Sequence, residues 1–402
     1  METMINRKQL KNALEVLHKI SGNKGFYGTS NVTYMDGFLY AQRGGMAGKI
    51  QMDLGDLPFQ VHNKTFLELI KNSKNEPATI ELIDDKVNID QFSIQTIPFD
   101  QMEFQEGFKK FFVEKSEYLG GPDLLKKMIR VNYAVGHDIN RAPLQYICVS
   151  WKHGAICASN GCIGSVQKIK KSYQPDLLIA SDFVGLADYA FCGKNPRLPG
   201  MVSVWKTPDL LIFKTESGTF IQVQSDLKYP GGEFLATLAD KTVDDPHCFK
   251  FEVNTEMMLH AFDRFKPLTK RTKATKEKDR AEPFYQLTFH KNALNIHVKN
   301  ANGEAEEVYS LCEFDERITD LELLLNAEYL KGAFAALRES DKVTGYCLSA
   351  CHSIIFSANM EEGFEAVMPI DPDYLARQRE REAREAARAA EESEEKEDSE
   401  NE

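Results

Sequence analysis

The chain has 402 residues, more than the ~250 that one hydrophobic core usually accommodates, so several domains are expected. Hydrophobic residues make up 42% of the chain, yet no run approaches the ~18 apolar residues of a membrane span, which favours globular domains and excludes a membrane partner. The formal net charge of −12 does not exclude a nucleic-acid partner, because residues 391–402 alone hold eight acids and one lysine.

The beginning of the chain predicts a cytoplasmic protein and a first one-sided helix. Residues 1–11 are polar and lack the apolar segment of a secretory signal. Over residues 7–20, apolar residues recur at steps of three and four: Leu10, Leu14, Leu17 and Ile20. A shorter helix, 63–70, precedes strands at 78–83, 86–89 and 92–97, and Pro98 closes this first unit.

The same order of elements returns in the middle of the chain. A helix is predicted over 122–133, where Pro122 fits the first turn and Asp123 suits the positive helix end. Its exposed face is basic and carries Lys126, Lys127 and Arg130. A second helix, 180–187, precedes strands at 201–205, 210–213 and 219–223, and Pro230 closes the unit.

A third unit fills the rest of the folded chain. Asn254 or Thr255 can cap a helix over 255–265, and the helix 326–334 precedes strands at 343–348 and 353–356. The unit closes at Val367–Ile370. After Pro372 the composition changes to Arg, Glu and Ala, which predicts a solvated helix and then a disordered acidic end.

A threefold internal repeat therefore determines the expected architecture. Each unit combines two helices with antiparallel strands, so the predicted fold class is α+β: three repeated modules, each with helices on one face of antiparallel sheets. The expected boundaries give module 1 (1–117), module 2 (118–244), module 3 (245–371) and a charged helical, acidic tail (372–402).

This arrangement resembles the bacterial DNA polymerase III beta subunit family, the DNA sliding clamps, over residues 4–370. Residues 321–337 resemble the family's "E-I-x-F-N-x-x-Y-L-x-D-x-L-x-x-L" helix, and residues 365–370 resemble its terminal "Y-V-V-M-P-M". Residues 59–70, 156–164 and 225–230 match family motifs in part. The family's "R-P-T-L-P-I-L" and "T-D-L-E" stretches are missing, as in a divergent member from a phage or mobile element.

The resemblance implies a processivity factor for DNA replication: a head-to-tail homodimer closed into a ring around double-stranded DNA. Helices would line the channel and meet phosphates without reading bases. A solvated loop is the alternative reading of the most basic stretch, 266–280. The expected channel residues are Lys24, Lys126, Lys127, Arg130, Arg141, Lys270, Arg271, Lys273 and Lys276.

The resemblance also implies an apolar cleft that receives short peptides from DNA polymerase and the clamp loader. Where the family carries His-Arg-Leu, this chain has Cys162-Ile163-Gly164, and Phe234 replaces a usual arginine, so a more apolar cleft is expected. For any one of these residues a plain core role is the alternative. The expected cleft residues are Leu144, Ser159, Gly161, Cys162, Ile163, Gly164, Pro230, Phe234, Leu235, Cys351, Ser353, Val367, Met368, Pro369 and Ile370.

Catalysis, metals and cofactors are not expected. The eight cysteines form no C-x-x-C pair and are interpreted as reduced thiols. Cys347, Cys351 and His352 lack the second facing cluster that a zinc site needs. The chain has no Gly-rich phosphate loop, G-x-S-x-G or H-E-x-x-H. The remaining alternative is a non-catalytic, repeat-built interaction scaffold that does not act on DNA, since fold alone does not determine function.

Overall fold

A computed structural model describes residues 3–22, 30–109, 111, 115–269, 284–290, 292–300, 303–318, 321–371, 373 and 380. The chain forms two compact units: unit 1 comprises Met1–Ala158 and Lys170–Pro230, and unit 2 comprises Ser159–Ile169 and Gly231–Glu402. No helix in the described part of the chain is long and apolar enough to cross a membrane.

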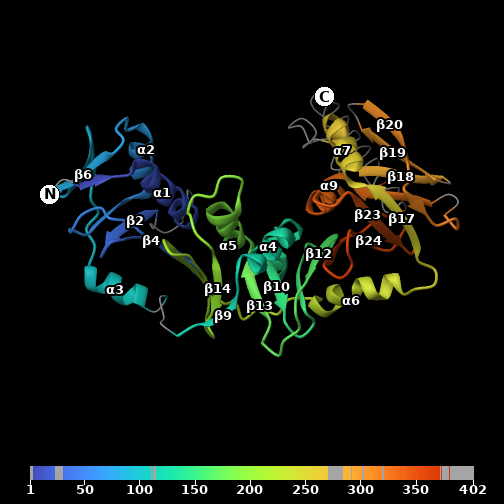
Figure 1. The fold of residues 1–402 in the computed structure, drawn as a ribbon, viewed down its shortest axis with the longest axis horizontal. Helices are drawn as coiled ribbons and strands as arrows, with labels where there is room; N and C mark the ends of the chain where they lie inside the picture. The colour runs from blue at the N-terminus through green and yellow to red at the C-terminus, as the bar shows by residue number, and fades with distance from the viewer. Residues whose placement is uncertain are drawn as a thin grey trace, which may run out of the picture. The chain divides into compact units, whose positions relative to one another are not determined.

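One order of elements recurs three times along the chain (Figure 1). The first run is β1 (Thr3–Ile5), α1 (Arg7–Ser21), β2 (Asn31–Met35), β3 (Phe38–Arg43), β4 (Met46–Gln51), β5 (Phe59–His62), α2 (Asn63–Asn72), β6 (Ala78–Ile83), β7 (Lys86–Ile89) and β8 (Phe92–Gln95). The second run is β9 (Glu117–Gly120), α4 (Pro122–Val131), β10 (Tyr146–Ser150), β11 (Ala155–Ser159), β12 (Ile163–Lys168), β13 (Leu177–Ala180), α5 (Ser181–Ala187), β14 (Ser203–Lys206), β15 (Leu210–Lys214) and β16 (Gly218–Val223).

The third run is β17 (Phe249–Asn254), α7 (Thr255–Thr269), β18 (Phe284–His290), β19 (Ala293–Asn300), β20 (Gly303–Ser310), β22 (Leu321–Asn326), α9 (Ala327–Ala336), β23 (Lys342–Cys347), β24 (Ile354–Ser357) and β25 (Gly363–Val367). The α+β prediction is confirmed, since every strand pairing within these runs is antiparallel. Additional elements are α3 (Gln101–Lys109), the short turns η1 (Asn132–Ala134) and η2 (Ile139–Gln145), the π-turn η3 (Asp188–Cys192), α6 (Gly232–Val243) and β21 (Glu313–Phe314).

The predicted helices bury the faces that their periodicity indicated. In α1, Leu10, Leu14, Leu17 and Ile20 are fully buried, and Asn6 caps the helix by accepting a hydrogen bond from the Gln9 backbone at 2.9 Å. Asn254 caps α7 in the same way, through the Met257 backbone at 2.8 Å. Side-chain burial and capping therefore agree on where these helices begin and which side faces the core.

In unit 1, strand β4 of the first run pairs with strand β16 of the second run in one sheet, and we call such a pairing between two runs a join. Strand order in this sheet is β5-β2-β3-β4-β16-β15-β14-β9, and the join pairs Met46 with Gln222 and Gly48 with Phe220. In unit 2, β12 pairs with β25 in the same way, with Ile163 opposite Val367.

The two joins share one register. Past the end of each join, the Val223 backbone N–H donates to the Gly45 carbonyl at 2.7 Å, and Met368 donates to Cys162 at 2.8 Å. Val223 and Met368 therefore hold equivalent positions in the repeat.

Helix α3 covers the side of this sheet that α1 does not. A Cβ built on Gly48 would meet Ile20 of α1, whereas its neighbour Ala47 lies in a cluster with Phe108 and Phe111. Because successive strand residues point to opposite faces, α1 and α3 lie on opposite sides of β4 (Figure 1). The sequence predicted no helix between the end of the first unit and the start of the second, so α3 was not anticipated.

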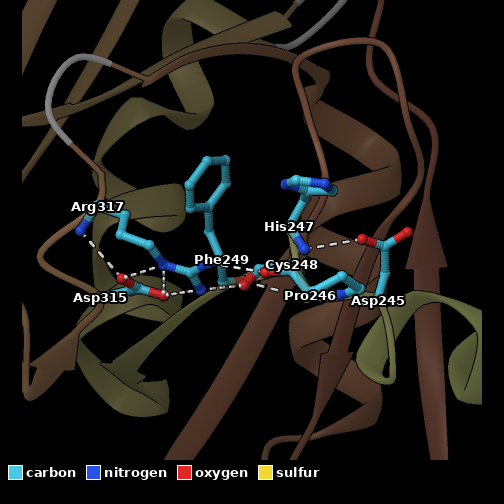
Figure 2. A network of polar contacts seen from close by, with 7 residues as sticks. All are labelled: Asp245, Pro246, His247, Cys248, Phe249, Asp315 and Arg317. Carbon is cyan, nitrogen blue, oxygen red and sulfur yellow. Dashed lines mark hydrogen bonds and ion pairs between the residues drawn. The ribbon is translucent and has the colours of Figure 1, made fainter.

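An arginine fixes the segment that leads into β17 (Figure 2). The Arg317 guanidinium donates to the carbonyl oxygens of Pro246 and Cys248, both at 2.8 Å, and forms an ion pair with Asp315 at 2.5 Å. It also lies 5.6 Å from the ring centroid of Phe249. One side chain thus holds the connection between α6 and β17.

Candidate functional site

Helix α4 presents the basic face that its sequence predicted. Leu125, Met128 and Val131 are buried on one side, which turns Lys126 outward. The Lys126 side chain is 70% exposed and lies 3.9 Å from Asp123 in an i,i+3 pair, which contributes little in water. Its charge is therefore available to a polyanion.

The other predicted channel residues divide into two groups. Lys127 and Arg130 are half-buried on α4, and Arg141 is exposed on η2, with its Nε 4.0 Å from an Asp138 carboxylate oxygen. Lys24, Lys270, Arg271, Lys273 and Lys276 lie outside the described residues. The structure thus brings Lys126, Lys127 and Arg130 together on one helix, and the channel assignment stays a prediction.

Two adjoining hollows beside α1 are lined by basic side chains that the sequence did not identify as site residues. A hollow of about 630 Å³ is lined by Lys19, Arg43 and the start of α5, and a second of about 420 Å³ is lined by Lys19, Lys194 and Arg197. Lys19 and Arg197 lie on the ring of Tyr189, at 5.1 and 5.3 Å from its centroid. No local motif reveals this group, because its members come from α1, from β3 and from the chain that follows α5.

Most of the predicted cleft residues belong to one unit. Leu144 and Pro230 are part of unit 1, and the other thirteen belong to unit 2. Within unit 2 the β11–β12 turn is shaped by Asn160, whose side-chain oxygen accepts hydrogen bonds from the backbones of Cys162 and Ile163, both at 2.9 Å. This turn leads directly into the β12–β25 join.

Two large apolar side chains of this set are exposed. Met368 is 44% exposed just after β25, and Phe234 is 54% exposed in the first turn of α6. The hydroxyl of Ser353 lies 3.2 Å from the Met368 sulfur. By contrast, Ile163, Leu235 and Val367 are buried, so their side chains contribute to the core below any docking surface.

The cysteines of this region differ in exposure and in proton affinity. Cys162 and Cys351 are exposed, whereas Cys347 is buried, and burial raises the pKa of its thiol to about 12. Among the described residues, no three His, Cys, Asp or Glu side chains gather as a metal site would require. The thiols of Cys162 and Cys351 are therefore open to solvent, whereas that of Cys347 is not.

Comparison with known proteins identifies the fold. No protein-family model and no curated protein matches the sequence. Among solved structures, the Bacillus subtilis DNA polymerase sliding clamp aligns with a TM-score of 0.73 at 15% identity, over 92% of this chain and 99% of that chain. The beta subunit of Streptococcus pyogenes DNA polymerase aligns with a TM-score of 0.71 at 17% identity, over 92% and 100%.

The Helicobacter pylori beta clamp, solved with a DNA ligase peptide, aligns with a TM-score of 0.72 at 18% identity, over 92% of this chain and 100% of that chain. Such likeness spans all three runs of elements, because it covers nearly the whole chain. This protein therefore has the fold of the bacterial DNA polymerase III beta subunits, the DNA sliding clamps.

Proposed function

We propose that this protein is a DNA sliding clamp: a non-catalytic ring in the cytoplasm that encircles duplex DNA and tethers the replicative polymerase. The observation that carries the proposal is the shared register of the β4–β16 and β12–β25 joins. Each join pairs the fourth strand of one run (β4, β12) with the last strand of the next run (β16, β25). In a chain of three runs, one strand of each of these two kinds therefore remains unjoined at the ends. Those strands are β8 and β20, each at the end of its sheet order.

The repeat also predicts how two chains would close the ring. Helices α2 and α9 begin at equivalent positions, and following the strand pairings back from each of them makes Ala305 of β20 equivalent to Gly48 of β4. Following the pairings onward from the β6–β7 and β14–β15 turns makes Phe92 of β8 equivalent to Phe220 of β16. A small residue of β20 would then lie opposite Phe92 of the partner chain, as Gly48 lies opposite Phe220. This head-to-tail contact closes after two copies of three modules.

DNA would pass along the helices. Lys126, Lys127 and Arg130 on α4 supply point charges for phosphates, and a ring that binds only the backbone can slide over any sequence. The mixed and partly acidic remainder of the surface favours loose rather than tight electrostatic binding.

Partners would dock through short apolar peptide segments at Met368 and Phe234. Met368 and Phe234 are both exposed apolar side chains of unit 2, and exposed apolar surface is what a short apolar peptide can bind. The clamp loader and polymerase would use this surface in turn. The absence of the family's usual arginine at Phe234 favours apolar over acidic peptide positions.

The ring model is tested by retention on DNA. After loading onto nicked circular DNA, the protein should co-elute with the circle in gel filtration and leave when the circle is linearised. Phe92→Asp should give a monomer in sedimentation and abolish retention, because a carboxylate would be buried in the join. Leu57→Asp is the matched control, since Leu57 is an exposed apolar residue that lies on neither β8 nor β20. Equal retention on circular and linear DNA would reject the topological model.

The docking surface is tested with a peptide. A fluorescent peptide of the Gln-x-x-Leu-Phe type should bind the wild-type protein and lose at least tenfold in affinity on Met368→Lys. Val223→Lys is the matched control, because Val223 occupies the equivalent position and is 40% exposed. Unchanged binding to Met368→Lys would reject the assignment of the cleft.

A further inference from the structure

Two loops of module 2 lie side by side at one end of β10. The turn Trp151–Gly154 joins β10 to β11, and the segment 169–176 joins β12 to β13. The Ser172 backbone N–H donates to the Trp151 carbonyl at 2.9 Å, which holds the two loops together. Trp151 is buried beneath them, so the turn has a fixed base. We call residues 151–154 and 170–176 the loop pair.

The loop pair is positively charged, whereas the chain as a whole is negatively charged. The loop pair contains three lysines, one histidine and a single acid, Asp176, in a chain with a net charge of −12. Lys152, Lys170 and Lys171 are exposed, and none of them forms an ion pair within the described part of the chain. Three unneutralised lysines within two tethered loops form a local positive surface.

The nearest acids do not cancel this charge. Asp176 accepts a hydrogen bond from the Ser150 hydroxyl at 3.1 Å, on the side of the strands. Glu117 lies 3.4 Å from the Lys206 ammonium and accepts a hydrogen bond from the Gln174 amide at 2.6 Å. Glu117 is thus paired with Lys206, whereas Asp176 belongs to the loop pair and keeps its charge, so the loop pair carries three lysines against one carboxylate.

An aromatic ring stands among these lysines. Tyr173 is fully exposed, so both faces of its ring are open to solvent. A tyrosine that buries nothing contributes nothing to the core and would ordinarily be replaced by a polar residue at no cost. Its position two residues after Lys171 places a stacking surface next to positive charge.

The equivalent loops of module 1 show that the fold does not require this charge. There the Met52 backbone donates to the Gly37 carbonyl at 2.9 Å, the counterpart of the Ser172–Trp151 bond. These loops carry Asp36, Asp53 and Asp56 and no lysine. The corresponding loops are therefore acidic in module 1 and basic in module 2, although the first turn has two residues in module 1 and four in module 2.

We propose that the loop pair binds single-stranded nucleic acid, with Lys152, Lys170 and Lys171 on phosphates and Tyr173 stacked on a base. Ammonium groups are point charges that suit phosphate oxygens, and stacking on an exposed ring accepts any base. An acidic peptide would instead favour arginines for bidentate carboxylate contacts, and the loop pair has none. This activity goes beyond encircling duplex DNA, since none of the four residues lies on a helix.

The test is fluorescence anisotropy of the full chain with a labelled oligothymidylate of about a dozen nucleotides. The double variant Lys170→Glu, Lys171→Glu should weaken binding roughly tenfold or more, and its log–log salt slope should be shallower by about 1.4, since each lost phosphate contact removes ~0.7. Tyr173→Ala should weaken binding about fivefold or more, whereas Tyr173→Phe should keep it.

Two controls separate this site from the proposed ring. The variant Lys74→Glu, Lys250→Glu changes the same charge at exposed positions elsewhere and should bind the oligonucleotide within about twofold of wild type. Lys126→Glu with Arg130→Glu should impair retention on circular DNA but leave the oligonucleotide bound. If the α4 variant loses the oligonucleotide and the loop variants keep it, the strand binds at the helices and the proposal is wrong.

A third outcome concerns the chemistry of the ligand. Polyglutamate and unlabelled oligothymidylate can be compared as competitors for the labelled oligonucleotide. If both displace it equally well and Tyr173→Ala does not change its affinity, the loop pair attracts anions in general and the proposal is overturned. Failure of the ring itself would appear differently, as loss of retention on circles with oligonucleotide binding intact.

Discussion

The substitution Gly345→Ala should destabilise unit 2 through one steric contact. Gly345 lies on β23 opposite Phe251 of β17, and a Cβ at this position would come within 2.2 Å of the Phe251 ring. Carbon atoms normally approach to about 3.5–4.0 Å, so the ring would have to move by more than about 1 Å.

The ring has little room to move. Phe251 is 2% exposed, and its centroid lies 4.6 Å from that of Phe289 and 6.3 Å from that of Phe356. Inserting a methyl group into such a packed site costs about 1–3 kcal/mol. For a unit of this size, each kcal/mol lowers the melting temperature by about 2–4 °C, so a decrease of roughly 2–12 °C is expected for unit 2.

Differential scanning calorimetry of the full chain measures this shift, with the two units followed as separate transitions. Gly107→Ala is the matched control, because a Cβ there meets nothing within 4 Å in helix α3, and alanine should stabilise that helix by about 0.5–1 kcal/mol. Phe251→Leu should relieve the clash, so that the double variant loses less than the sum of the two single variants. A melting temperature within about one degree of wild type for Gly345→Ala would refute the reasoning.

Three further predictions follow from single side chains. Burial raises the pKa of Asp90, but hydrogen bonds from the Ser73 hydroxyl and from β6 outweigh burial and lower the pKa overall. The stabilisation from ionised Asp90 is therefore present above the unfolded pKa of about 4 and is lost as the pH falls through the folded pKa. Asp90→Asn should be less stable than wild type at pH 7 and should lose less stability on acidification, as measured by acid titrations followed by circular dichroism. Parallel titration curves for the two proteins would contradict this. Arg317→Lys cannot reproduce the fork of hydrogen bonds in Figure 2, so native-state proteolysis with thermolysin should cleave residues 244–249 faster than in wild type, and equal rates would count against it. Because burial raises the pKa of the Cys347 thiol to about 12, iodoacetamide near pH 8 should label Cys351 well before Cys347, as read by peptide mass spectrometry; simultaneous labelling would show that the buried strand opens readily.

The periodic helices were predictable because their signal is local. The apolar residues Leu10, Leu14 and Leu17 repeat at helical spacing, and the structure buries all three on one side of α1. The same holds for α4, where Pro122 begins the helix as expected and Lys126 lies outward. Recurrence of the pattern in three places predicted the repeated α+β fold without any tertiary information.

Helix α3 was missed because its stability comes from residues far away in the sequence. Phe104 and Phe108 pack against Tyr40 at 5.5 and 5.2 Å between ring centroids, and Trp205 packs against the same cluster. The local pattern of residues 101–109 is limited to Phe104 and Phe108, four residues apart, and does not show what these rings would pack against. Their helix forms because a distant sheet face supplies the apolar surface.

The residues predicted to form the cleft show the same division. Sequence motifs placed Met368 and Val367 next to each other at the end of the chain's third module, but their alternation between surface and core follows from the pairing of β25 with β12. Only the pairing reveals that Val223 is the counterpart of Met368, and hence a control for it.

The sequence by itself determined the α+β class, the threefold repeat and the basic face of α4, because each depends on residues a few positions apart. The tertiary structure decided the shared register of the β4–β16 and β12–β25 joins, the burial of α3 and the meeting of the two loops around Tyr173. Those features depend on hydrogen bonds and packing between residues far apart in the chain, and a periodic pattern carries no information about which distant partner it will meet.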